Sequence, residues 1–160
     1  MKTVADLDRD ALERFAVGFG FELRVVADDV AIPGSYWGAP EAGLEGNAVI
    51  VQHATPIHSL LHETSHWLMC TPERRAQLFV DAGGTDAEEE AVCALQLELA
   101  GRLPAYSGDE CLADMDAWGY SFRQGHAAAW LREDGPLARR RWPAHVHAAL
   151  NGRGSVPARR

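Results

Sequence analysis

LLHETSHWLM, residues 60–69, decides the fold of this chain, because it contains the motif His62-Glu63-Thr64-Ser65-His66. On a helix this HExxH spacing brings both imidazoles to one face, one turn apart. The two histidines can then bind one metal ion. Glu63 lies at the edge of the same site, where it can take a proton from a metal-bound water. Thr55-Pro56 supplies the helix start, with a capping hydroxyl followed by proline at the first helical position.

The segments before this helix predict a small sheet with one helix packed on it. In the first segment apolar residues recur at helical spacing, and Gly18 and Gly20 end it. Two short apolar runs predict strands, and the segment between them is rich in glycine and proline. The predicted elements are a helix over 8–17, a strand over 21–26, a loop over 31–47 and a strand over 47–52.

The remainder of the chain is predicted to be helical. Thr71-Pro72 repeats the helix-start signal and predicts a helix to about residue 82, closed by Gly83-Gly84. Thr85 or Asp86 begins the next helix, and shorter helices are expected over 108–118, 124–133 and 143–150. These elements indicate the α+β class. We expect one helix-rich domain over residues 1–150, followed by a disordered tail over 151–160.

A third protein ligand is needed, because zinc and ferrous iron sites usually add one to two histidines and leave a position open. Glu88, Glu89 and Glu90 follow the motif across one intervening helix and can supply it. The buried stripe of their helix is expected to contain Val92, Leu95, Leu99 and Leu103. Projecting this stripe back by three and four residues gives Glu89 and Glu88. The periodicity therefore favours Glu89, with Glu88 as a close alternative.

Other side chains are candidates for contacts around the metal. His58 precedes His62 by one turn on the same face and is expected beside the site. Tyr36 and Trp37 lie in the glycine- and proline-rich loop, where they either line a substrate cleft or cover one end of the core. A site of this type needs a group that stabilises developing negative charge. The sequence offers three candidates and does not choose among them: Tyr120, Tyr106 and His126.

Composition restricts the class of protein. The chain has 160 residues, of which 47% are hydrophobic, as expected for one globular domain. Its net charge of -8 argues against a nucleic-acid partner. No apolar run reaches the ~18–20 residues of a membrane helix, and the N-terminus lacks an apolar signal core. We therefore expect a cytoplasmic protein without a membrane partner, in which Cys70, Cys93 and Cys111 are buried thiols.

The HExxH motif followed by a glutamate on a later helix resembles the gluzincin metallopeptidases. In that family both histidines and the later glutamate bind zinc, and the glutamate of the motif is the general base. Glu88-Glu89-Glu90-Ala91 also looks like the ExxA pattern of some of these peptidases, which favours Glu88.

A longer part of the chain resembles the bacterial elongation factor P hydroxylase family, which has a zincin-like fold. The similar segments are LERFAVGFGFELRVV, NAVIVQHA, LLHETSHWLM, the pair Arg74-Arg75 and the ALQ segment Ala94-Leu95-Gln96. In that family two histidines and a carboxylate hold a non-haem iron, so the resemblance implies oxygen chemistry. By registration on ALQ it implies His62, His66 and Glu89 as ligands. It also implies a translation factor as a candidate partner.

Three functions follow from these observations. The first is an oxygen-dependent hydroxylase that uses Fe(II) and modifies a protein side chain or a small molecule. The second is a Zn(II) metallopeptidase or amide hydrolase with Glu63 as general base. The third is a non-catalytic binding module, in which His58 or Cys93 closes the metal site with a fourth ligand. The first two share their ligands and differ in the metal.

Overall fold

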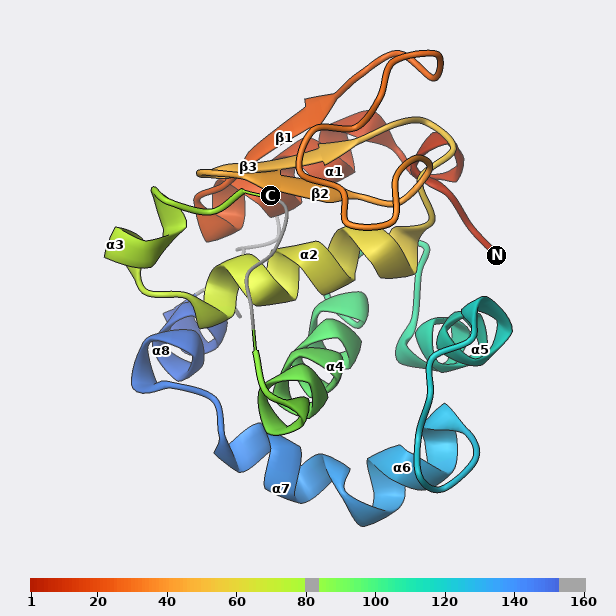
Figure 1. Ribbon diagram of the computed structural model, residues 1–160, viewed down its shortest axis with the longest axis vertical. Helices are drawn as coiled ribbons and strands as arrows, with labels where there is room; N and C mark the ends of the chain where they lie inside the picture. Colours follow the sequence, from red (N-terminus) through yellow and green to blue (C-terminus); the bar gives the residue numbers. More distant parts are fainter. Residues whose placement is uncertain (80–83, 153–160) are drawn as a thin grey trace, which may run out of the picture.

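A computed structural model describes residues 1–79 and 84–152 (Figure 1). This part of the chain is helix-rich and carries one three-stranded sheet, which confirms the α+β class. The strands are β1 (Glu22–Val25), β2 (Gly43–Glu45) and β3 (Ala48–Val51). The helices are the 3-10 turn η1 (Val4–Asp6), α1 (Arg9–Phe19), α2 (Ile57–Met69), α3 (Pro72–Arg75), α4 (Asp86–Ala100), α5 (Gly108–Trp118), α6 (Ala127–Glu133), α7 (Gly135–Arg140) and α8 (Ala144–Gly152).

The sheet lies at one end of the molecule, with α2 beneath it and most of the other helices beyond α2 (Figure 1). The strand order is β1-β3-β2, with β1 parallel and β2 antiparallel to β3. All four residues of β3 are buried. Val49 and Val51 belong to the main core, whereas Ala48 and Ile50 form a small cluster with Ile32 on the opposite face. A strand covered on both faces must be apolar throughout, as the sequence AVIV is.

Helix α2 lies between the sheet and α4, and it is buried along most of its length. Two polar residues inside it satisfy their hydroxyls locally: Thr64 donates to the Leu60 carbonyl and Ser65 to the Leu61 carbonyl. These hydrogen bonds let α2 pack closely on both sides. At its C-terminal end, Arg75 donates to the main-chain oxygen of Trp67 at 2.9 Å. The same guanidinium lies 3.8 Å from the centroid of the Trp67 ring.

The start of α2 differs by one residue from the prediction. Pro56 is the N-cap, and the hydroxyl of Thr55 instead accepts a hydrogen bond from the main-chain nitrogen of Gln52 at 2.8 Å. Thr55 therefore closes the turn after β3 instead of capping the helix. The first helix agrees better with its signals: Asp8 caps α1 through the Ala11 nitrogen, and Gly20 ends it in the left-handed conformation.

The prediction of one continuous loop over 31–47 is wrong, because β2 lies within it. This strand has three residues and begins with glycine, so it carries almost no strand signal of its own. Its pairing with β3 provides the hydrogen bonds that define it. Strands of this length are decided by their neighbour and not by local propensity.

The prediction for the helix after Thr71 was also too long. Thr71 caps it as expected, but α3 covers only Pro72–Arg75. Leu78 and Phe79 pair with the chain around β2, through Gly46 and Glu45 respectively, and this pairing draws the chain out of the helix. The predicted end at Gly83 lies outside the described residues.

Two errors concern the C-terminal third. Helix α7 lies between the helices expected over 124–133 and 143–150 and was not predicted; it begins with Gly135 and Pro136, and proline is compatible with the first turn of a helix. The last helix was expected to end at residue 150 but extends to Gly152, so the domain continues beyond its predicted boundary. The remainder of the predicted tail, 153–160, lies outside the described residues.

All three cysteines are buried and unpaired, as expected. Within the described residues, no helix combines the length and apolar character needed to cross a membrane.

A close backbone approach beside β2 provides the first testable prediction. Gly34 has a φ of +71°, and a Cβ atom there would overlap the main chain of Leu44. Gly38, with a φ of +87°, has no heavy atom within 4 Å of that position. We expect Gly38→Ala to cost about 1–2 kcal/mol, the usual penalty for a left-handed alanine. Gly34→Ala should cost roughly 3 kcal/mol or more, because the clash adds to that penalty.

The measurement is the free energy of unfolding in urea. Equal losses in the two variants would show that the main chain around Leu44 yields without cost. That result would contradict the close approach of Gly34 to β2.

Candidate metal centre

Helices α2 and α4 bring three potential metal ligands together. His62 and His66 lie one turn apart on α2, with ring centroids 4.8 Å apart. Glu89 faces them from α4: its Oε1 lies 3.2 Å from His66 Nε2, and its Oε2 lies 3.6 Å from His62 Nε2. One ligand atom from each residue lies within 4.8 Å of the other two. This is the one group of its kind found in the part of the chain that the structure describes.

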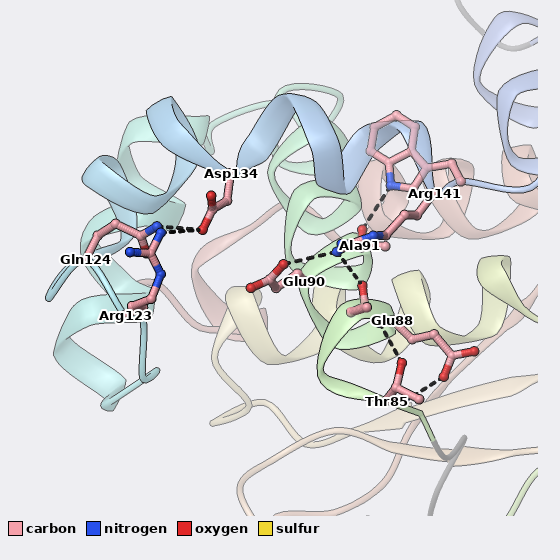
Figure 2. A network of polar contacts seen from close by, with 10 residues as sticks. Thr85, Glu88, Glu90, Ala91, Arg123, Gln124, Asp134 and Arg141 are labelled. Carbon is pink, nitrogen blue, oxygen red and sulfur yellow. Dashed lines mark hydrogen bonds and ion pairs between the residues drawn. The ribbon is translucent and has the colours of Figure 1, made fainter.

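The neighbouring glutamates have other partners, which Figure 2 shows. The carboxylate of Glu88 accepts from the main-chain nitrogen of Thr85 at 2.7 Å, and the Thr85 hydroxyl accepts from the Glu88 nitrogen. This capping box fixes the start of α4. Glu90 forms an ion pair with Arg141 at 3.1 Å. The structure therefore brings Glu89, and not Glu88, to the histidines.

The rotation of α4 that presents Glu89 is set by its apolar face. Of the four positions expected in its buried stripe, Val92, Leu95 and Leu99 lie on α4 and are buried, whereas Leu103 is buried beyond the end of the helix at Ala100. Glu89 lies one turn before Val92, and with α4 packed on α2 its carboxylate faces the two imidazoles.

The protonation states of these residues suit a cation. Burial, together with the neighbouring His66, lowers the pKa of His62 to about 4, although Glu89 opposes this shift. His62 is therefore neutral at pH 7, as a metal ligand must be. Burial raises the pKa of Glu89, but the hydrogen bond with His66 and the charges of both imidazoles outweigh it, so the pKa lies below its usual value. Two imidazoles and a carboxylate fit Zn(II) and Fe(II) alike.

The three residues form part of the wall of a cavity of about 630 Å³. Glu63, the glutamate of the motif, lines the same cavity. The cavity is also lined by the four residues that the sequence offered as further contacts: His58, Tyr120, Tyr36 and Trp37. Tyr36 and Trp37 are 65% and 78% exposed, which places them at the mouth of the cavity and not in the core.

The other two candidates for charge stabilisation are used elsewhere. The hydroxyl of Tyr106 donates to Asp114 at 2.8 Å in the interior, and His126 caps α6 by accepting from the Ala129 nitrogen. Neither residue lines the cavity. Tyr120 does, and burial raises the pKa of its phenol well above the usual range, so the phenol keeps its proton.

Three residues of this site were not singled out as site residues from the sequence. Trp118, at the end of α5, donates from its indole nitrogen to Glu41 at 2.6 Å, and this hydrogen bond joins two walls of the cavity. Gln96 is fully buried on α4 and contacts His62 through its side chain at 3.1 Å. A signal for Gln96 existed, since it is a lone polar residue in an apolar stretch two turns after Glu89. Trp118 and Glu41 carried no such signal.

Neither residue proposed for a closed site joins the metal group among the described residues. His58 directs its Nδ1 towards the Tyr120 hydroxyl, 3.2 Å away. Cys93 is buried and lines a smaller neighbouring cavity of about 340 Å³. Its burial raises the pKa of the thiol far above the usual range, which disfavours the thiolate that a metal binds. Among the described residues the group therefore offers three potential ligands and no fourth, as an open site does.

No protein-family model, no curated protein and no solved structure matches this chain. The resemblance to the hydroxylase and peptidase families therefore stays a prediction. The geometry of the site is the ground on which a function can be proposed.

Metal binding can be tested with two adjacent glutamates. Adding Zn(II) to the metal-free protein should raise its free energy of unfolding, by about 2.7 kcal/mol at a free concentration one hundred times Kd. Glu89→Gln should abolish most of this gain, because it removes the anionic ligand. Glu88→Gln is the matched control and should keep the gain, since glutamine can also complete the capping box. Unfolding followed in the presence and absence of zinc measures both. Equal zinc responses of the two variants would contradict the assignment of Glu89.

The stability of the metal-free protein should fall in acid. Burial first, and then His62, lower the pKa of His58 to about 4, against 6.5 for the unfolded chain. Between these values the unfolded state binds more protons, so the free energy of unfolding falls as the pH falls from 6.5 to 4. His58, which is 1% exposed, contributes up to about 3 kcal/mol to this loss. His58→Gln should therefore reduce the slope of the free energy of unfolding against pH in this range, and His62, whose pKa is also lowered to about 4, should account for the slope that remains. An unchanged slope between pH 6.5 and 4 would contradict the burial of a neutral imidazole there.

Proposed function

We propose that this protein is a metalloenzyme in which His62, His66 and Glu89 hold one divalent ion, and that it hydroxylates its substrate with dioxygen and Fe(II). One observation carries the metal assignment: two imidazole nitrogens and one carboxylate converge from α2 and α4 at the wall of a solvent-accessible cavity. The resemblance to the elongation factor P hydroxylase family favours iron over zinc. It also favours a protein side chain, such as one on a translation factor, over a small molecule as substrate.

The reaction balances as R–H + O₂ + 2 e⁻ + 2 H⁺ → R–OH + H₂O, so it needs a two-electron reductant as co-reactant. When bound, Fe(II) supplies the redox chemistry and open positions for dioxygen and substrate. The chain supplies the surroundings. His62, His66 and Glu89 would hold the ion at the wall of the cavity. Glu63 can hold or accept a proton there, and the protonated Tyr120 phenol can donate a hydrogen bond.

The sheet edge favours a single inserted side chain or a small molecule over an extended peptide. A peptide that binds by strand addition needs free main-chain groups along an edge strand. β2 follows the loop that lines the cavity, and main-chain groups on its outer edge already form hydrogen bonds within the protein. Leu44 donates to the Gly34 carbonyl, and Gly46 donates to the Leu78 carbonyl at 2.9 Å. Contacts with substrate must therefore come from side chains at the mouth of the cavity.

A second candidate is a Zn(II) amide hydrolase, and the position of Glu63 favours it. Its carboxylate lines the same cavity as the three ligands, where a general base for a metal-activated water belongs. In that reaction Glu63 accepts the proton of the attacking water and passes it to the leaving amine.

Metal content separates the two candidates. Protein without a His tag is purified anaerobically, and its zinc, iron and iron oxidation state are measured. Stoichiometric Fe(II) that is oxidised by dioxygen supports the hydroxylase. Stoichiometric zinc supports the hydrolase, provided that iron is absent even from protein produced in iron-supplemented medium. If the wild type holds neither metal and His62→Ala has the same metal content as the wild type, both candidate functions are excluded.

Glu63→Gln tests the role of the motif carboxylate. If the enzyme is a hydrolase, we expect turnover to fall about 10²–10⁴-fold while metal content stays unchanged, because the general base is lost and the ligands remain. If it is a hydroxylase, oxygen consumption should persist. Glu88→Gln, which alters the glutamate of the capping box at the start of α4, is the control for any effect of removing one carboxylate nearby.

A further inference from the structure

Gln96 is a fully buried amide that joins three helices. From α4 its side chain reaches His62 and the main chain of His58, both on α2, and Cys111 on α5. The Tyr120 hydroxyl lies 3.5 Å from the same amide. A buried polar side chain with this many partners is held in one orientation, because each lost hydrogen bond would leave an unsatisfied group.

The partners determine which end of the amide is which. The Nε2 atom lies 2.9 Å from the carbonyl oxygen of His58. A carbonyl oxygen can only accept a hydrogen bond, so the amide atom facing it must be the NH₂ group. The weak acceptor Cys111 Sγ, 3.7 Å away, lies on the same side. The amide oxygen of Gln96 must therefore be the atom that faces His62.

This orientation determines where the proton of His62 lies. The Oε1 atom of Gln96 is 3.1 Å from His62 Nδ1. Since an amide oxygen only accepts, Nδ1 must carry the hydrogen and donate it. In a neutral imidazole the other nitrogen, Nε2, then has a free lone pair. That lone pair lies on the side of Glu89, whose Oε2 is 3.6 Å away. Two acceptors that face each other at this distance are stabilised by a cation between them.

We propose that Gln96 is a positioning residue that fixes His62 in the Nδ1–H tautomer, with Nε2 free to bind the metal. This inference rests on the proposed metal site and adds the group that prepares it. A neutral amide suits the role better than a carboxylate. It accepts from His62 without placing another negative charge in the interior beside Glu89, and its NH₂ group satisfies the His58 carbonyl at the same time.

The test reads the tautomer directly, on metal-free protein without substrate. Two-bond ¹H–¹⁵N correlation spectra distinguish Nδ1–H from Nε2–H imidazoles. We expect His62 to show Nδ1–H in the wild type, and to lose that preference in Gln96→Met, which keeps the length of the side chain without its hydrogen bonds. Gln96→Glu retains an acceptor and should retain the tautomer. Gln52→Met, a buried glutamine next to β3 that contacts the Val30 carbonyl, is the matched control.

Zinc titration of the same proteins gives the second readout. Gln96→Met should bind Zn(II) about 10–100-fold more weakly than the wild type, the usual effect of losing such a partner, and Gln52→Met should bind normally. A wild-type His62 with its proton on Nε2, or a Gln96→Met variant with unchanged tautomer and affinity, would overturn the inference. If Gln96→Met does not fold, the spectra of the wild type and of Gln96→Glu still test the tautomer of His62. Failure of the proposed hydroxylation would appear separately, as metal-loaded protein with the expected tautomer and no oxygen consumption.

Discussion

The packing of α2 against α4 is the contact on which the site depends. Apolar side chains hold the two helices together, and the phase of that contact decides which polar side chains meet. Val92 and Leu95 are buried on α4, and Leu60 and Leu61 are buried on α2. With α4 packed on α2, Glu89 lies opposite the two imidazoles. The burial of apolar surface contributes about 25 cal/mol per Å². This free energy holds the Glu89 carboxylate in a position that would be unfavourable without it. A change in the register of either helix would separate the ligands without altering any of them.

The polar layer between these helices is mostly satisfied from within the protein. The Gln96 side chain forms hydrogen bonds with His62 Nδ1 and with the His58 carbonyl, and the Tyr120 hydroxyl is the partner of His58 Nδ1. Among the described residues, His58 Nε2 is one of the few buried polar atoms without a hydrogen-bond partner. An unsatisfied buried group costs about 1–3 kcal/mol.

The charge of the cavity agrees with its geometry. Glu41, Glu63 and Glu89 line it, and among residues 1–79 and 84–152 no lysine or arginine does so. Three carboxylates in a partly enclosed space produce a negative potential that favours a divalent cation. The aromatic rings of Tyr36 and Trp37 lie at the mouth, and the hydrogen bond from Trp118 to Glu41 ties the loop before β2 to the end of α5. Segments far apart in the sequence thus converge on one opening.

The sequence by itself determined the parts of this protein that follow from local periodicity. The HExxH spacing placed His62 and His66 on one face of a helix, and the apolar stripe of α4 favoured Glu89 with Glu88 as a close alternative, because helical geometry fixes which residues share a face. Tertiary structure alone decided the rest. Short β2 exists only through its pairing with β3, and α3 ends early because Leu78 pairs beside that strand. Likewise, Gln96 could be recognised as the partner of His62 only once α4 was packed on α2. These outcomes depend on hydrogen bonds between distant segments, and no local pattern of residues encodes them.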